Sequence, residues 1–257
     1  MFTRLGSVEF LDTSMHMRLR AVRSVVGVAA AIGILGMAGV ASANLVITPT
    51  FGSSITNDPN AATIESTINT AIGTYEAYFA TPINVSIKFK EMGSGLGMSE
   101  TYYAPPITYS QYYHALATHA TTTNDAMALA SLPVPLTANS NNPVTASSGI
   151  NMTLPLARAL GLNGTNFSGS PDGTVLLNTS TMNLSRASTN SSKYDLQTVV
   201  YHEINEVLGL GSSLDGNTTT PTTSPVNPED LFRYSAANTR SYTVSSAATV
   251  FRQKGVV

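Results

Sequence analysis

The fold is decided by one stretch of the chain, Tyr201-His202-Glu203-Ile204-Asn205-Glu206-Val207-Leu208-Gly209-Leu210-Gly211-Ser212. Its apolar residues recur at helical spacing, which predicts a core helix that ends in a sharp turn at Gly209. Residues four apart lie on one helical face, so His202 and Glu206 can point at a common ion, with Glu203 beside it. A metal-free core helix is the alternative, but one His and two Glu would then be costly to bury without partners.

This stretch matches the zinc-hydrolase pattern H-E-x-x-H-x-x-G-x-x-H in part. It keeps the first His (His202), the acid (Glu203) and the glycine (Gly209), and it carries Glu206 and Ser212 at the second and third metal positions. Zinc accepts carboxylate oxygen as well as imidazole nitrogen, so Glu206 is compatible with zinc. Ser212 offers only a neutral hydroxyl. The set should therefore hold zinc less tightly than three His, and manganese and calcium are alternative ions.

Residues 1–43 are typical of a signal peptide. Basic residues up to Arg23 precede an apolar run, Val25–Val40, and Ala41-Ser42-Ala43 supplies a cleavage signal that leaves Asn44 as the mature start. A single membrane anchor is the alternative, but the run is short and rich in Gly, which favours cleavage. We therefore expect a secreted bacterial protein, periplasmic or extracellular, with no stable membrane span after cleavage.

Charge and cysteine content support an exported single domain over residues 44–257. Four of the thirteen basic and two of the fifteen acidic residues lie in residues 1–43, so the remainder carries a formal charge of about −4 and no basic patch suited to nucleic acid. There is no Cys, so the stability of an exported domain must come from packing or bound ions.

The remaining pattern predicts an α+β domain, a small twisted mixed sheet packed against a long helix and the motif helix. The long helix should begin with Asn57 or Asp58 as its cap and bury Ile64, Ile68, Ile72, Tyr75 and Phe79. Asn124 should cap a shorter helix, and Asp195 or Ser192 the motif helix. The expected ranges are strands at 45–47, 83–90 and 174–178, the last edging the cleft; helices at 57–80, 109–120, 125–132 and 154–160; and a Gly-rich loop at 91–97.

The order of these elements and the H-E-x-x-E-x-x-G turn resemble a zincin metalloprotease of the metzincin type. More narrowly, V-V-Y-H-E-I-N-E-V-L-G-L-G-S followed by P-E-D-L-F-R-Y-S-A resembles secreted bacterial metalloproteases in which H-E-I-x-E-V-L-G-x-G-S replaces the three-His motif. The likeness extends from Pro59 to Ser241. Relatives carry further C-terminal sequence, so we expect a domain truncated at its C-terminus.

The resemblance implies roles for individual residues. His202 and Glu206 would bind the metal, Glu203 would be the general base, and Ser212 occupies the third-ligand position. Asp215 is a substitute third ligand or a surface turn residue. Tyr234, in the segment that stands where metzincins have a Met-containing turn, would approach the metal or the oxyanion, or be a core aromatic.

The function expected on this basis is that of a secreted metal-dependent endopeptidase. It would use zinc or another divalent cation, and an extended peptide would bind along the edge strand of the sheet. The alternative functions are a catalytically inactive, zincin-derived secreted binding protein and a structural surface protein, which the Thr-, Asn- and Ser-rich composition favours.

Overall fold

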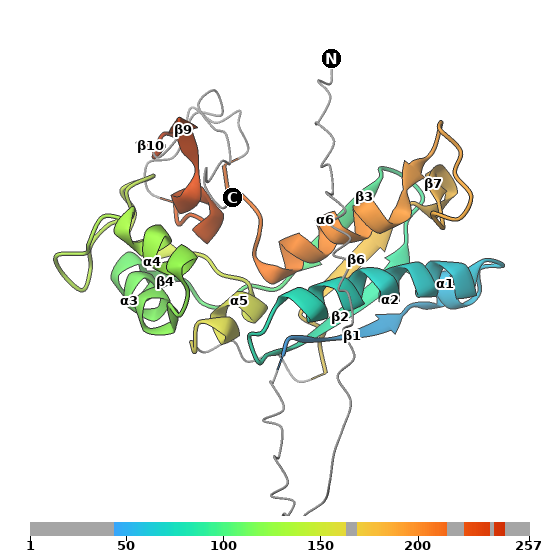
Figure 1. The fold of residues 1–257 in the computed structure, drawn as a ribbon, viewed down its shortest axis with the longest axis horizontal. Coiled ribbons are helices and arrows are strands. Elements are labelled where there is room, and N and C mark those ends of the chain that lie inside the picture. The colour runs from blue at the N-terminus through green and yellow to red at the C-terminus, as the bar shows by residue number, and fades with distance from the viewer. Residues whose placement is uncertain (1–43, 163–168, 215–223, 237–238, 245–257) are drawn as a thin grey trace, which may run out of the picture. The chain divides into compact units, whose positions relative to one another are not determined.

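A computed structural model describes residues 44–162, 169–214, 224–236 and 239–244 (Figure 1). The expected signal peptide (residues 1–43) and Asp215 lie outside these described residues. The described elements all belong to one compact unit that begins at Ala41.

The elements mix α and β structure, as the sequence predicts. In chain order they are β1 (Val46–Phe51), α1 (Ser53–Thr56), α2 (Ala61–Tyr78), β2 (Asn84–Glu91), β3 (Gly97–Thr101), β4 (Ile107–Thr108), α3 (Tyr109–His119), α4 (Thr123–Ala130), β5 (Gly149–Ile150), α5 (Leu154–Ala159), β6 (Gly173–Leu177), the 3-10 turn η1 (Thr179–Thr181), β7 (Met182–Asn183), β8 (Tyr194–Asp195), α6 (Leu196–Leu208), η2 (Pro228–Phe232), β9 (Tyr234–Ala236) and β10 (Thr239–Arg240).

The main sheet has four strands in the order β1-β2-β6-β3. β1, β2 and β6 are parallel, and β3 runs antiparallel to β6 at the edge. The clean alternation in β2 buries Val85, Ile87 and Phe89 on one face, as predicted. The strand expected to edge the cleft, β6, is instead an interior strand of the sheet. The Gly-rich loop expected at 91–97 is present between β2 and β3, but the edge strand β3 that follows it is not among the elements predicted from the sequence.

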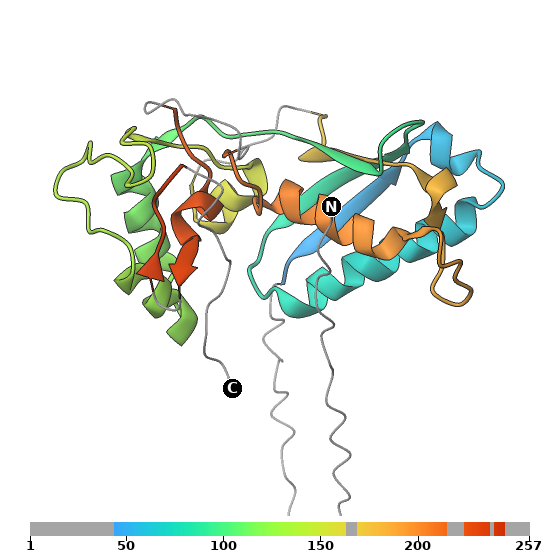
Figure 2. The same ribbon diagram turned by 90° about the horizontal axis from the view of Figure 1, so that it is seen from above.

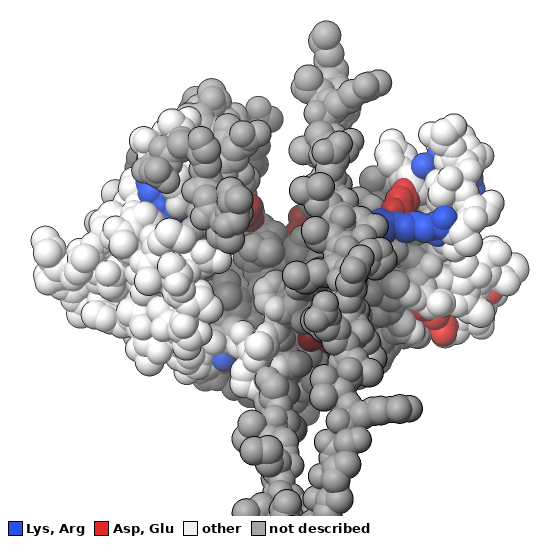
Figure 3. Space-filling view, viewed as in Figure 1, with Lys and Arg blue, Asp and Glu red and all other residues white. Residues whose placement is uncertain are grey.

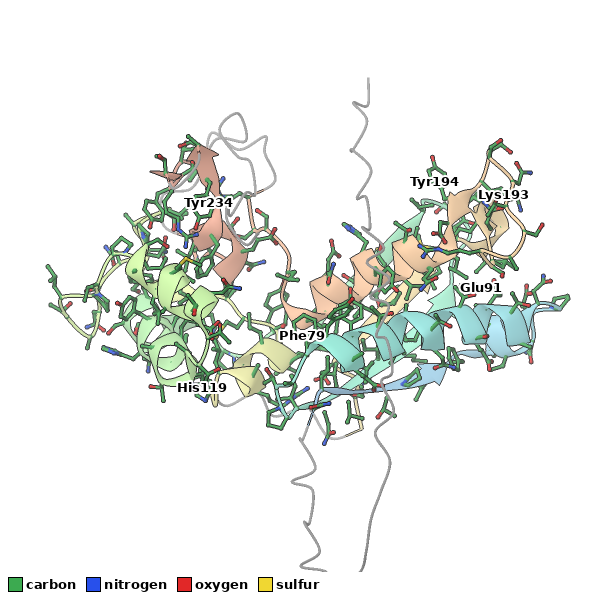
Figure 4. All side chains as sticks on the ribbon, in the orientation of Figure 1. Phe79, Glu91, His119, Lys193, Tyr194 and Tyr234 are labelled. Atoms are coloured by element: carbon green, nitrogen blue, oxygen red, sulfur yellow. The ribbon has the colours of Figure 1, made fainter. Side chains whose placement is uncertain are left out.

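The helices α2 and α6 lie side by side on one face of this sheet (Figures 1 and 2). α2 buries Ile64, Ile68, Ile72 and Tyr75 as its spacing predicts. The sequence also predicts that Phe79 is buried, but the residue is 44% exposed. The reason is that α2 ends one residue earlier, at Tyr78 (Phe79 is labelled in Figure 4). The N-cap is Asn60 rather than the expected Asn57 or Asp58.

Polar contacts tie α2 to α6 above the apolar layer. The Tyr75 hydroxyl donates to the Tyr201 carbonyl oxygen at 2.8 Å and to Asn205 Oδ1 at 2.7 Å, and the hydroxyls of Thr74 and Tyr201 lie 2.9 Å apart. Burial, with a smaller contribution from Tyr201, raises the pKa of Tyr75 to about 12. The helix that carries the candidate site is therefore fixed to its neighbour as well as to the sheet.

A second apolar cluster is built from α3, α5 and the segments around Val226 and Leu231. Thr108 caps α3 through a capping box with Gln111. Thr122, not the expected Asn124, caps α4, and Asp125 closes its capping box. α5 ends at Ala159, and Gly161 follows in a left-handed conformation (φ +64°), close to the predicted stop.

Within the described ranges, no helix is long and apolar enough to cross a membrane. On the face shown in Figure 3, Lys and Arg side chains of the described residues form no continuous basic surface.

Candidate functional site

The site is built on α6, whose two ends follow from local sequence. Asp195, one of the two predicted caps, caps the N-terminus of α6. Its Oδ1 accepts a hydrogen bond from the Gln197 N–H at 3.1 Å. Gly209 ends the helix in the left-handed region (φ +104°), and the Leu210 N–H reaches back to the Asn205 carbonyl at 2.8 Å. The sharp turn predicted from Gly209 is thus present.

Two glycines of the sheet let α6 approach closely. A Cβ atom on Gly97 in β3 would collide with Glu203 Oε1 and lie 2.7 Å from Val199 Cγ1. A Cβ on Gly173 in β6 would lie 2.7 Å from Val207 Cγ2. The polar residues of α6 are therefore held directly over the edge strand of the sheet.

His202 and Glu206 form the pair that the helical spacing predicts. His202 Nε2 and Glu206 Oε1 lie 3.4 Å apart, and their side chains are 71% and 38% exposed. Two ligands ~2.0–2.1 Å from one tetrahedral zinc ion lie roughly 3.3 Å apart, so the pair has the spacing of two ligands on one ion. The same spacing also suits an ion pair one helical turn apart when the imidazole is protonated.

The second oxygen of Glu206 is bound by the edge strand. Ser99 in β3 donates its hydroxyl hydrogen bond to Glu206 Oε2 at 2.5 Å, the length of a charge-assisted bond. Glu206 therefore has one oxygen held by the sheet and the other directed toward His202.

Glu203 differs from its two neighbours because it is buried, at 4% exposure. Its carboxyl group accepts no hydrogen bond from the residues that the structure describes. Burial raises the pKa of Glu203 to about 7, the Glu206 carboxylate adds to the rise, and His202 opposes it. A carboxyl group with a pKa near neutrality is suited to accepting and returning a proton.

Ser212, at the expected third-ligand position, is hydrogen-bonded to another carboxylate in this structure. Its hydroxyl donates to Asp230 Oδ1 at 2.6 Å. Asp230 is fully buried, and its carboxylate also accepts hydrogen bonds from the backbone and hydroxyl of Ser213 and from the Asn227 N–H. Ser212 thus connects the loop after α6 to η2 by way of Asp230.

Tyr234, the other expected site residue, lies on β9, and the Arg240 guanidinium stacks 4.5 Å from the centre of its ring. Figure 4 shows its position on β9, next to β10 and not over α6. The structure therefore brings together His202, Glu203 and Glu206, and it places Ser212 and Tyr234 in other contacts.

A cleft of about 220 Å³ opens beside Glu206. Its walls come from β3, from the start of α5 and from the loop that follows α6, and its lining is mostly hydroxyl and amide groups: Ser99, Thr101, Tyr103, Asn151, Thr153, Glu206, Gly209, Gly211, Ser212, Asn227 and Pro228. The Oγ1 atom of Thr101 is buried and has no hydrogen-bond partner.

A further carboxylate approaches this cleft from η2. The pKa of Glu229 is raised by burial first, then by Asp230 and by Glu206. The electrostatic effect of Glu206 indicates that the two carboxylates are close enough to interact.

The donor chemistry of the site fits a divalent cation at two protein ligands. Imidazole nitrogen and carboxylate oxygen are both zinc ligands, and their spacing suits one ion. Among the described residues, however, no group of three or more His, Cys, Asp or Glu side chains converges closely enough to hold a metal. Within the described residues, the two ligands that could hold a cation are therefore His202 and Glu206.

The sequence pattern found the residues on α6 and missed those that reach them from elsewhere. Ser99 lies just after a Gly-rich loop, and Glu229 and Asp230 follow Ser212, the end of the motif, by 17 and 18 residues. The only earlier sign of the last two is the P-E-D-L-F-R-Y segment, which the resemblance placed under the metal.

Comparison of the chain with protein-family models, curated proteins and solved structures found no match.

Proposed function

We propose that the chain is a metal-dependent endopeptidase with a zincin-like domain, and that His202 and Glu206 bind its cation. The observation that carries the proposal is the 3.4 Å separation of His202 Nε2 and Glu206 Oε1, with the buried Glu203 carboxyl on the adjacent residue. Glu206 also lines a polar cleft, from which a substrate could reach the ion.

A divalent cation at this pair would supply Lewis-acid polarisation of a carbonyl group and a lowered pKa for water. Burial raises the pKa of Glu203 to about 7, so its carboxyl group can take up and release a proton near neutral pH. In the proposed reaction Glu203 accepts the proton of the attacking water and returns it to the leaving amine. Ser99 and His202 keep Glu206 in its orientation.

The edge strand β3 is the proposed binding surface for an extended peptide. In its antiparallel pairing with β6, the Tyr102 N–H bonds the Asp172 carbonyl and the Leu96 carbonyl accepts from Asn178. Backbone groups alternate between the two sides of an antiparallel strand, so those of Gly97, Ser99 and Thr101 face the unpaired side. An added peptide strand would bond to them and pass beside the cleft.

The proposed setting is the periplasm or the extracellular space of a bacterium. The signal-like segment at residues 1–43 supports it. The zincin-like assignment is supported by the edge strand that crosses the motif helix and by the glycine turn after it.

A non-catalytic binding protein that keeps this architecture is the second candidate. It is favoured by Ser212, whose hydroxyl is bonded to Asp230, and by the absence of a third charged or imidazole ligand among the described residues. Such a protein would bind peptide at β3 without cleaving it.

Metal content and turnover should be measured together on the purified chain and on three variants. We expect one Zn²⁺ or Mn²⁺ per chain in the wild type and in Glu203→Gln, and loss of the ion in His202→Ala. His114→Ala is the matched control, since His114 is also an exposed helical residue. Hydrolysis of an unstructured protein substrate should fall by about 10²- to 10⁴-fold in Glu203→Gln, the usual contribution of a general base.

Three outcomes separate the alternatives. A wild-type chain that binds none of Zn²⁺, Mn²⁺ and Ca²⁺ would overturn the metal site. Bound metal without hydrolysis would favour the binding protein. Equal metal loss in His202→Ala and His114→Ala would show that the ion is not held by α6.

A further inference from the structure

Glu206 is the point at which the edge strand of the sheet touches the candidate cation site. It projects from α6 toward β3, and Ser99 is the β3 residue that meets it. The two residues are 107 positions apart in the chain, so the contact exists only because α6 packs over β3.

The two oxygens of Glu206 have different partners. Oε2 accepts the Ser99 hydroxyl hydrogen bond at 2.5 Å, and Oε1 lies 3.4 Å from His202 Nε2. A glutamate side chain has several rotatable bonds, and ordering it costs roughly 1–2 kcal/mol of conformational entropy. Ser99 has a short side chain on a hydrogen-bonded strand, so it can fix the carboxylate before any ion arrives.

We infer that Ser99 is a positioning residue for the cation site, which it orients by holding Glu206 Oε2 so that Oε1 alone faces the ion beside His202. This inference rests on the proposed metal-binding function of the His202–Glu206 pair. The Ser99 hydroxyl donates a hydrogen bond to Oε2, which leaves Oε1 as the oxygen that binds the ion. Partners of this kind, which bind a metal ligand without touching the metal, typically contribute 10- to 100-fold to metal affinity.

The other hydroxyl groups that line the cleft are engaged elsewhere or have no partner. Ser212 bonds to Asp230, and Thr153 accepts the Leu156 N–H at the start of α5. Thr101 lies two residues after Ser99, on the same face of β3, and its Oγ1 has no partner. Of the hydroxyl side chains that the structure describes around the cleft, Ser99 alone bonds to Glu206.

The test is a metal titration of the purified chain after removal of bound ions with a chelator. Zn²⁺ and Mn²⁺ are added separately and binding is followed by calorimetry, while Co²⁺ absorption reports the geometry of the ligands. We expect Ser99→Ala to weaken the Kd by about 10- to 100-fold and to alter the Co²⁺ spectrum. Ser99→Thr, which keeps the hydroxyl, should remain within a few-fold of the wild type.

Thr101→Val is the matched control. It removes a hydroxyl from the same strand face and the same cleft without removing a bond to Glu206, so the Kd should not change. Melting temperatures of the metal-free proteins should be nearly the same for all variants. If Ser99→Ala does not fold, Ser99→Val and Ser99→Thr give an equivalent comparison, because they have the same shape and differ in the hydroxyl.

The outcomes separate this inference from the function beneath it. If the wild type binds metal and Ser99→Ala binds it equally well, the positioning role is overturned and the proposed function stands. If Thr101→Val weakens binding as much as Ser99→Ala, general packing of β3 on α6 explains the effect and the role is again overturned. If the wild type binds no ion, both proposals fall.

Discussion

Glu203 approaches the edge strand closely at Gly97. A Cβ atom on residue 97 would collide with Glu203 Oε1, so the absence of a side chain at Gly97 leaves room for the carboxyl group. The position of the candidate general base on α6 therefore depends on a glycine, which has no reactive side chain.

Gly97→Ala should disturb the general base while leaving the metal pair in place. The added methyl group would displace Glu203 Oε1 and press on Val199, and a shift of about 1 Å in a catalytic group can cost 10²-fold in rate. We expect kcat to fall by about 100-fold at unchanged metal content. Gly93→Ala is the control, because a Cβ at Gly93 meets no atom within 4 Å. Unchanged turnover in Gly97→Ala would show that the position of Glu203 does not matter.

The site residues that the sequence predicts are those whose relative positions are set by a single helix. His202, Glu203 and Glu206 follow from a spacing of one and four, which the geometry of an α-helix converts directly into positions in space. Ser99 could not be found in this way, because its contact with Glu206 depends on which strand lies under α6. The expected role of Ser212 rests on resemblance alone, and in this structure its hydroxyl binds Asp230.

Among the elements, α6 is stabilised at its N-terminus by a single carboxylate. Asp195 Oδ1 accepts the Gln197 N–H, and Oδ2 accepts hydrogen bonds from Arg186 and Thr198. Burial acts to raise the pKa of Asp195, but the hydrogen bonds from Arg186 and Thr198 outweigh it, and the net shift is downward. The stability that this carboxylate contributes is therefore present above the unfolded-state pKa of about 3.9 and is lost as pH falls through the lower folded-state value.

Asp195→Ala should lower the free energy of unfolding by about 1 kcal/mol at pH 7, the usual cost of removing an N-cap. The difference from the wild type should shrink as the pH is lowered below about 4, because the wild-type carboxylate then becomes protonated. Asp195→Asn should lose less at pH 7, since Asn also caps helices, and should flatten the acid limb of the stability curve. Urea unfolding at a series of pH values measures all three proteins, and a pH-independent deficit in Asp195→Ala would contradict the linkage.

The elements that the sequence predicted are those with an unbroken period. α2 and β2 have long apolar repeats, and α5 and α6 also have clear caps and glycine stops, so local rules suffice for them. β3 was missed because Gly97 and the short run after it carry no buried alternation, and the strand exists only through its pairing with β6. Likewise, the interior position of β6 is a property of strand order, which no local pattern contains.

At the scale of the whole described unit, two apolar clusters have to be held in register for the cleft to exist. One cluster lies between the main sheet and α2 and α6, and the other surrounds α3 and α5. Arg158 on α5 donates to Asp172 Oδ2 at 2.7 Å and to the Asn84 carbonyl at 2.8 Å. Asp172 precedes β6 and also accepts the Ser86 N–H, so this ion pair joins the second cluster to the two central strands of the first.

Because it is more buried, the Arg158–Asp172 ion pair should contribute more to stability than the Arg186–Asp195 ion pair. The side chains of Arg158 and Asp172 are 23% and 1% exposed, against 53% and 33% for Arg186 and Asp195. Removing one partner of a buried pair leaves a desolvated charge and costs roughly 3–5 kcal/mol, whereas an exposed pair contributes about 0–1 kcal/mol. Arg158→Ala should therefore lower the free energy of unfolding by about 3 kcal/mol, toward the lower bound because Arg158 is partly exposed.

Arg186→Ala is the matched control and should lose no more than about 1 kcal/mol, both values being measured by urea unfolding at pH 7. Because Arg158 fixes α5, whose N-cap Thr153 lines the cleft, its loss should loosen the contact of α5 with α6 at Gly209, where Leu156 packs. Peptide affinity at the edge strand should then weaken in Arg158→Ala and stay unchanged in Arg186→Ala. Equal losses of stability in the two variants would show that the buried pair does not join the clusters, and that their register is set by apolar packing alone.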